Sequence, residues 1–180
     1  MGDTGTETSY RVVERRPDDL DVPTAHALWR LRQDVFVVEQ ECPYPDLDGR
    51  DLLPTTRHLV LEEVAGDGAP EVVGCLRLLD AADAADEQEG PVRLGRVVLA
   101  RRVRGRGLAD LLVRAALDRV GDREVVLDAQ EPLAGWYAGF GWEVSGPGFL
   151  EDGIPHVPMR RPADGGPAVV PPDPADPAEL

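Results

Sequence analysis

The chain has 180 residues, of which 42% are hydrophobic and 29% charged. This length and balance are typical of one globular domain and exclude a chain that is disordered throughout. Its apolar runs are all shorter than the roughly 18 residues that a membrane helix needs, and the first ten residues lack the pattern of a secretory signal. We therefore expect a cytoplasmic protein in which Cys42 and Cys75 are reduced thiols.

The charge is strongly acidic. The formal net charge is −15, and all 19 basic residues are arginine. An average of this sign disfavours a general binder of polyanions, because contacts to phosphates need clustered basic side chains.

Composition divides the chain into an ordered body and two tails. Residues 163–180 are rich in Pro, Ala, Gly and Asp and have almost nothing to bury, so we predict a disordered acidic tail. Residues 1–8 are predicted to be loose in the same way. The remaining residues, 9–162, form the predicted folded domain.

Hydrophobic periodicity and turn residues predict the elements of this domain. In chain order we expect a strand at 10–15, a helix after Pro23, a loop at 40–57, a hairpin of strands at 58–64 and 71–79, an acidic loop, and a strand at 93–99. A helix follows at 108–120, with Leu108, Leu111, Leu112 and Ala115 on its buried face, then a strand at 124–129, a short helix at 132–140 and two strands near 142–149 and 154–160. The order β-α-β-β-β-α-β-α-β-β defines an α/β fold with one mixed sheet and helices packed on it.

The most informative segment joins the strand at 93–99 to the helix at 108–120. Six arginines and no acid lie between Arg93 and Arg106, against the acidic average. Gly105 and Gly107 allow successive backbone N–H groups to turn toward one point, and the helix adds its amides and the positive end of its dipole. This arrangement suits a pyrophosphate. The alternative is a surface turn with solvated arginines.

Two common phosphate loops do not fit this segment. A dinucleotide-binding loop needs glycine where Asp110 stands, and a P-loop needs a lysine, which the chain lacks. The segment does match the pattern Arg-x-x-Gly-x-Ala from Arg104 to Ala109. It therefore resembles the acetyl-coenzyme-A loop of the GNAT N-acetyltransferase superfamily, whose order of elements is also the order predicted here.

Further segments support this resemblance. Residues 136–142, Trp-Tyr-Ala-Gly-Phe-Gly-Trp, resemble the aromatic-Tyr-x-x-x-Gly-aromatic segment of the family. Shorter matches resemble the ElaA-type branch, at 35–40, 42–44, 46–49, 57–58, 95–97, 129–130 and 151–156. The resemblance covers roughly residues 10–161. It implies a single GNAT-like domain whose mostly antiparallel sheet is splayed between the fourth and fifth strands.

The resemblance also implies acetyl-CoA as the co-substrate and places its binding on two elements. The backbone of Val97, Val98 and Leu99 would pair with the pantetheine arm. The pyrophosphate would be held by the amides of Arg104, Gly105, Arg106, Gly107, Leu108 and Ala109. Gln130, at the end of the fifth strand, would contact the coenzyme or the acceptor, or have a structural role. The side chains of Arg101, Arg102 and Arg106 would meet the adenosine phosphates, or serve only as surface charge.

The implied chemistry is transfer of an acetyl group from a thioester to a primary amine, by direct attack in a ternary complex. Tyr137 matches the family tyrosine that protonates the leaving thiolate. Glu39, after the first helix, and His156, on the last strand, are the candidates for the general base. Each residue also has a structural alternative. Tyr137 would be a packed aromatic ring, Glu39 a solvated loop acid, and His156 a packed or hydrogen-bonded side chain.

An acidic segment follows the first helix. It contains Glu39, Glu41, Asp46, Asp48 and Asp51. These carboxylates either attract a cationic amine or form an ordinary solvated loop. No His, Cys or Asp spacing typical of zinc or calcium sites occurs, so no metal is expected.

Three functions compete at this point. The first is an N-acetyltransferase for a small amine or for a peptide or protein amino group, working as a monomer or homodimer without nucleic acid or membrane. The second is a non-catalytic module that binds or senses acyl-CoA, which would not need Tyr137. The third is a nucleic-acid binder that uses the arginine cluster, although no aromatic residues are interleaved with it to stack on bases.

Overall fold

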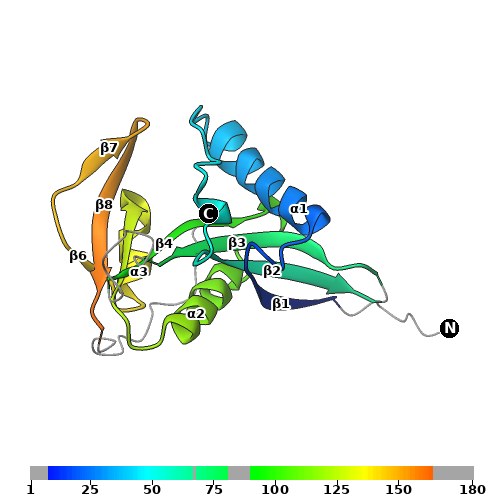
Figure 1. Ribbon diagram of the computed structural model, residues 1–180. Helices are drawn as coiled ribbons and strands as arrows, with labels where there is room; N and C mark the ends of the chain where they lie inside the picture. The colour runs from blue at the N-terminus through cyan, green and yellow to red at the C-terminus, as the bar shows by residue number, and fades with distance from the viewer. Residues whose placement is uncertain (1–7, 67, 81–89, 164–180) are drawn as a thin grey trace.

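The computed structural model describes residues 8–66, 68–80 and 90–163. Within these ranges the chain forms one sheet of eight strands with helices on both faces (Figure 1). The predicted tails lie outside the described residues except for Thr8 and Ala163, as does most of the predicted acidic loop. The domain boundaries therefore stay predictions. No helix in the described ranges is long and apolar enough to cross a membrane.

The strands follow the predicted order, and their spatial order is β1-β2-β3-β4-β5-β8-β6, with β7 paired to β8. Four strands form an antiparallel group: β1 (Thr8–Arg15), β2 (Arg57–Ala65), β3 (Glu71–Leu79) and β4 (Val92–Leu99). The second group contains β5 (Val125–Gln130), β6 (Glu143–Val144), β7 (Phe149–Glu151) and β8 (Ile154–Arg161). Only β4 and β5 are parallel, so the predicted mixed and mostly antiparallel sheet is confirmed.

Two helices cover opposite faces of the first group of strands (Figure 1). Helix α1 (Val22–Arg32) starts at Asp21, whose carboxylate accepts a hydrogen bond from the Thr24 amide at 2.8 Å. A π-helical turn, η1 (Gln33–Glu39), continues it. Helix α2 has the predicted bounds, Leu108–Val120, and is flanked by the cap residues Gly107 and Gly121. Short helical turns η2 (Arg50–Leu52), η4 (Arg101–Val103) and η5 (Glu131–Leu133) and helix α3 (Ala134–Ala138) complete the list.

Each face of the sheet has its own apolar core. On the α1 face, Leu28 and Leu31 pack with Val60, Cys75 and Val98. On the other face the buried side of α2 packs on strands β2 to β5. That side consists of Leu108, Ala109, Leu112, Val113, Ala116 and Val120. The predicted face was therefore wrong at Leu111, which is 39% exposed. The buried stripe runs along two adjacent rows of the helix, one through Leu112 and one through Val113, and Leu111 lies beside this stripe on the solvent side.

The predicted strand at 142–149 is also wrong in one respect: it is two short strands, β6 and β7. The interruption coincides with Ser145-Gly146-Pro147-Gly148, where proline cannot donate to a ladder. The two glycines pass close to β8, because a Cβ at Gly146 would lie 3.1 Å from the Pro158 ring and one at Gly148 would lie 3.2 Å from the His156 carbonyl oxygen.

The feature that positions the site is the junction of β4 and β5. Their parallel ladder contains only two pairs, Val92 with Val125 and Arg93 with Val126. Beyond these pairs the two strands separate, and the two halves of the sheet diverge (Figure 1). The predicted splay between the fourth and fifth strands is confirmed.

A β-bulge lies in β4 just past this junction. The register with β3 shifts between Cys75 and Arg77, so that Arg96 and Val97 of β4 stand opposite one residue of β3. Arg96 has a φ of 55°, in the left-handed region. A bulge of this kind turns the strand and leaves a backbone group outside the ladder. The edge of β4 that faces β5 thus has backbone groups with no strand partner after Arg93.

Candidate active site

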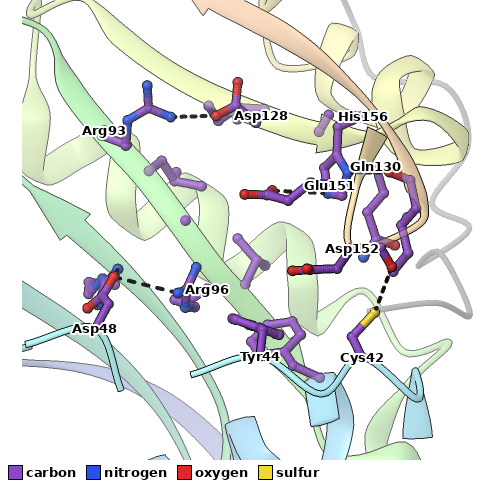
Figure 2. Close-up of a pocket in the computed structure, with 18 of the residues that line it drawn as sticks. Cys42, Tyr44, Asp48, Arg93, Arg96, Asp128, Gln130, Glu151, Asp152 and His156 are labelled. Carbon is purple, nitrogen blue, oxygen red and sulfur yellow. Dashed lines mark hydrogen bonds and ion pairs between the residues drawn. The ribbon is translucent and has the colours of Figure 1, made fainter. Parts of the chain in front are cut away.

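A cavity of about 760 Å³ occupies the opening between β4 and β5. Its walls come from residues 94–97 of β4, 127–130 of β5, the segment 40–50 and the turn between β7 and β8 (Figure 2). The volume is in the range of small-molecule sites. Of the predicted site residues, Val97, Gln130, Tyr137 and His156 line this cavity.

Tyr137 reaches the cavity from α3. Its side chain is only 5% exposed, and no hydrogen bond from its hydroxyl group is recorded to any described residue. Trp136 and Trp142 hold the ring by edge-on contacts with centroid separations of 4.7 and 5.8 Å. Burial raises the pKa of the phenol above its ordinary value, so the hydroxyl keeps its proton at neutral pH. The site therefore contains a fixed O–H donor with room for a partner.

His156 lies on β8, directly opposite Gln130 of β5 in the ladder. Its Nδ1 is 2.9 Å from the carbonyl oxygen of Ile154. A carbonyl only accepts, so this contact assigns the proton of the neutral ring to Nδ1 and leaves Nε2 with a lone pair. The ring stacks on Phe149 with a centroid separation of 5.8 Å. Gln130 donates its side-chain amide to the Gln40 side chain at 3.3 Å.

Glu39 is not among the residues that line the cavity. It ends the π-helical turn η1, and its two carboxylate oxygens accept hydrogen bonds of 2.6 and 3.1 Å from the guanidinium of Arg104. The hydrogen bond from Arg104 lowers the pKa of Glu39. Arg104 also donates from Nε to the Leu99 carbonyl at 3.2 Å. The pair therefore ties the end of η1 to the segment that follows β4.

That segment has the shape expected of a phosphate loop. Gly105 and Gly107 have φ values of 71° and 72°, in the left-handed region. A Cβ added at either residue would meet no atom within 4 Å, so the space beside both glycines is open. The N-cap residue of α2 is Gly107, which has no side chain to cap the first turn, and the positive end of the helix dipole lies at this loop.

Most arginines of this region make contacts within the protein. Arg102 pairs with Glu63 at 2.5 Å and with Glu71 at 2.9 Å, and Arg106 donates to the Tyr10 hydroxyl at 3.1 Å. With Arg93, Arg96 and Arg104 also paired to carboxylates, four of the six arginines of the cluster are neutralised within the protein. The nucleic-acid hypothesis loses its main support.

The interpretation of the acidic segment is wrong for Asp46 and Asp51, which are buried rather than solvated or free for a ligand. Buried Arg32 of α1 donates from Nε to Asp46 at 2.8 Å and from Nη1 to Asp51 at 2.6 Å. The His58 ring nitrogen Nε2 lies 3.0 Å from the Asp51 carbonyl oxygen, so this buried histidine has a structural role.

Two further arginines complete this network. Arg77 of β3 binds both oxygens of Asp48 at 2.8 Å and Asp51 at 3.0 Å. Arg96 of the bulge lies 2.7 Å from Asp46. The sequence did contain a signal for these residues: Arg77 interrupts an apolar strand, and a charged side chain there needs a buried partner. The network fixes the segment 46–51 against β3 and β4 as one wall of the cavity.

The comparisons with known proteins agree with this geometry. Residues 64–162 match the family model of the acetyltransferase (GNAT) domain. Over 147 residues the chain is 47% identical to UPF0039 protein Rv2851c of Mycobacterium tuberculosis (strain ATCC 25618 / H37Rv), covering 82% of this chain and 90% of the relative. Over the same length it is 37% identical to protein ElaA of Escherichia coli (strain K12), covering 79% and 90%.

Solved structures show the same relationship. The crystal structure of Escherichia coli ElaA superposes with a TM-score of 0.74 at 34% identity. That of an acyl-CoA N-acyltransferase from Pseudomonas aeruginosa superposes with a TM-score of 0.73 at 39% identity. Each superposition covers 85% of this chain and 99% of the solved chain.

The fold and the cleft between β4 and β5 therefore define an acyl-CoA-dependent acyltransferase. The chain belongs to the GNAT acetyltransferase family, and its relatives are the ElaA and UPF0039 proteins. The resemblance inferred from the sequence is confirmed.

The buried network predicts how stability depends on pH. Burial opposes ionisation of Asp48 and Asp51, but hydrogen bonds from Arg77 and Arg32 outweigh it and hold both pKa values below the ordinary range. The unfolded chain then binds more protons, so the stabilisation is present above about pH 4 and is lost as the pH falls below it. We expect the melting temperature to fall steeply between about pH 5 and pH 3.

Asp48→Asn tests this assignment, because Asp48 is the least buried carboxylate of the network. The variant should be less stable at neutral pH and should lose part of the acid-side slope in thermal melts. Asp118→Asn, on the exposed side of α2, controls for the loss of one negative charge. An unchanged slope in Asp48→Asn would contradict the account.

Proposed function

We propose that the protein is an acetyl-CoA-dependent N-acetyltransferase that transfers the acetyl group to a primary amine by direct attack in a ternary complex. The observation that carries the proposal is the hydroxyl of the largely buried Tyr137 side chain, which lines the cleft of a GNAT-family fold without a hydrogen-bond partner among the described residues. The acceptor class expected from the sequence, a small amine or a peptide amino group, and the cytoplasmic location belong to this proposal.

The coenzyme would lie along β4 and the loop that follows it. The edge of β4 at Val97, Val98 and Leu99 has no strand partner toward β5, so its backbone groups are suited to pair with the amides of a pantetheine arm. The segment from Arg104 to Ala109 would hold the pyrophosphate, since its left-handed glycines leave open space at the start of α2.

In the proposed reaction the amine nitrogen forms a bond to the thioester carbonyl carbon, and the carbon–sulfur bond breaks. The bulge at Arg96 and Val97 favours an unpaired backbone N–H, at Val98 or a neighbour, as the donor to the carbonyl oxygen as it becomes negative. Tyr137 gives its proton to the departing thiolate. Its raised pKa supports this role, because the phenol is protonated at neutral pH.

The base that takes the proton from the amine is assigned to His156. Nε2 carries the lone pair and the ring lines the cavity. Glu39, the other candidate from the sequence, is assigned a positioning role. Its carboxylate is bound by Arg104 outside the lining and its pKa is lowered, both of which make it a poor base. Through Arg104 it would orient the phosphate loop.

Tyr137→Phe tests the proposed acid. The variant should reduce kcat by about 10²-fold or more, because a positioned general acid contributes that much, while the dissociation constant for acetyl-CoA stays within experimental error. The rate is followed as amine-dependent thiol release from acetyl-CoA. An unchanged kcat would remove Tyr137 from the mechanism.

Gly107→Glu tests the proposed phosphate loop. The new side chain would place bulk and negative charge in the open space beside a left-handed glycine, so binding of acetyl-CoA should be lost in a calorimetric titration. Gly121→Ala is the matched control, since Gly121 also has a positive φ but lies at the far end of α2. The control should lose stability and keep coenzyme binding. Equal coenzyme affinity in Gly107→Glu and the parent would refute the assignment.

Glu39→Gln and His156→Gln separate positioning from base catalysis. Glu39→Gln weakens one charge-assisted pair, so we expect KM for acetyl-CoA to rise about three- to tenfold with little change in kcat. His156→Gln should lower kcat by about 10²-fold without changing the affinity for acetyl-CoA. The reverse pattern would identify Glu39 as the base.

A further inference from the structure

The charged groups that line the cavity do not all neutralise one another. Among the lining acids, Asp48 is bound by Arg77 at 2.8 Å, and Asp128 is bound by Arg93 at 2.7 Å. The two remaining lining acids, Glu151 and Asp152, have no arginine partner in the described chain. The uncompensated negative charge of the cavity therefore comes from one place, the turn between β7 and β8.

This turn directs both carboxylates into the cavity (Figure 2). Glu151 pairs with Ile154 at the end of the hairpin, and Asp152 and Gly153 form a two-residue turn with φ values of 50° and 84°. The turn contacts the opposite wall, where the thiol of Cys42 donates a hydrogen bond to the Asp152 carbonyl oxygen, with 3.8 Å between Sγ and oxygen. Two negative charges thus have a fixed place above the cleft.

The environment of these carboxylates lacks a positive partner. Within residues 8–66, 68–80 and 90–163, the one basic group recorded near Glu151 is the ring of His156, at 3.9 Å. No hydrogen bond or ion pair of the Asp152 side chain is recorded within the described residues. A cation bound here would gain from both charges without displacing an existing ion pair.

A second, independent feature marks the same cavity as a ligand site. The Tyr137 side chain is 5% exposed and lines this cavity, and no hydrogen bond of its hydroxyl is recorded within the described residues, so the hydroxyl is available to a ligand or water. The cavity therefore has a reactive end, near Tyr137 and His156, and an anionic turn that borders this end, because the Glu151 carboxylate lies 3.9 Å from Nε2 of His156 and Asp152 lies one residue further along the turn. Its volume of about 760 Å³ leaves room for a small extended molecule that spans both.

We infer that the acceptor is a small amine with a second cationic group, a diamine or a related compound, and that Glu151 and Asp152 bind this second cation. The inference rests on the proposed function, since it concerns the acceptor of that reaction. Arg50 also lines the cavity and is the one lining cation without an ion pair in the described chain. Arg50, Glu151 and Asp152 are all exposed, and one guanidinium opposes two carboxylates, so the balance of charge favours a cation.

Three acceptors with the same four-carbon chain and the same reacting amine test this inference. They are 1,4-diaminobutane, n-butylamine and 4-aminobutanoate, which end in a positive, a neutral and a negative group. We expect kcat/KM for the diamine to exceed that for n-butylamine by about tenfold, and 4-aminobutanoate to be the poorest acceptor. A preference for 4-aminobutanoate, which Arg50 would explain, or equal values for the diamine and n-butylamine would overturn the inference.

Variants of the turn locate the effect. Asp152→Asn removes the charge and keeps the turn, because asparagine also adopts the left-handed conformation readily. Asp152→Asn should raise KM for the diamine about three- to fivefold, with KM for n-butylamine and the affinity for acetyl-CoA unchanged. Glu151→Gln should raise KM for the diamine more than KM for n-butylamine, because Glu151 also borders His156. Glu143→Gln on β6 removes an exposed carboxylate outside the cavity lining and should leave all three values as in the parent.

The two proposals fail in different ways. If acetyl-CoA does not bind, or if no amine in a broad screen releases thiol from it, the proposed function fails and this inference falls with it. If other amines are acetylated while the diamine is not preferred, or if the turn variants leave its KM unchanged, the inference alone is overturned.

Discussion

The site depends on how little β4 and β5 pair. A parallel ladder of only two residue pairs joins the two halves of the sheet, and beyond it both strands continue with their facing edges apart. Sheets normally satisfy such backbone groups with a neighbouring strand. Here the separation produces instead a cleft with main-chain donors and acceptors along one wall and Tyr137 in the other. The bulge at Arg96 belongs to the same arrangement, because it bends β4 at the point where the strands part.

The walls of this cleft are held by charge as well as by apolar packing. Three arginines and three aspartates, which come from α1, β3, β4 and the segment 46–51, neutralise one another at the edge of the cavity. Such buried pairs are weak evidence for net stability, because desolvation offsets most of their attraction. They are strong evidence for fixed geometry, because removing one partner leaves a buried charge. The pair of Glu39 and Arg104 links η1 to the segment between β4 and α2 in a similar way.

The elements that follow from local periodicity were predictable from the sequence, and α2 is predicted to the residue. The splay was predictable because the motif around Gly105 and Gly107 resembles a family in which it occurs; the phosphate-binding role of that motif stays a prediction. The ion pairs of the aspartates in the segment 46–51 were not predictable from the sequence. In the sequence Asp51 has the surroundings of an ordinary loop acid. Its partners Arg32 and Arg77 lie 19 and 26 residues away in the chain, so only the folded sheet brings them together. The unpaired state of Asp152 is a property of the same tertiary arrangement.

The measurement that tests the account most directly is a crystal structure of the protein with coenzyme A. The account predicts the thiol between β4 and β5, within hydrogen-bond reach of the Tyr137 hydroxyl, and the pyrophosphate against Gly105 and Gly107 at the start of α2. The cavity beside His156 would remain open for the amine. Coenzyme bound outside the cleft, or a thiol remote from Tyr137, would contradict the account.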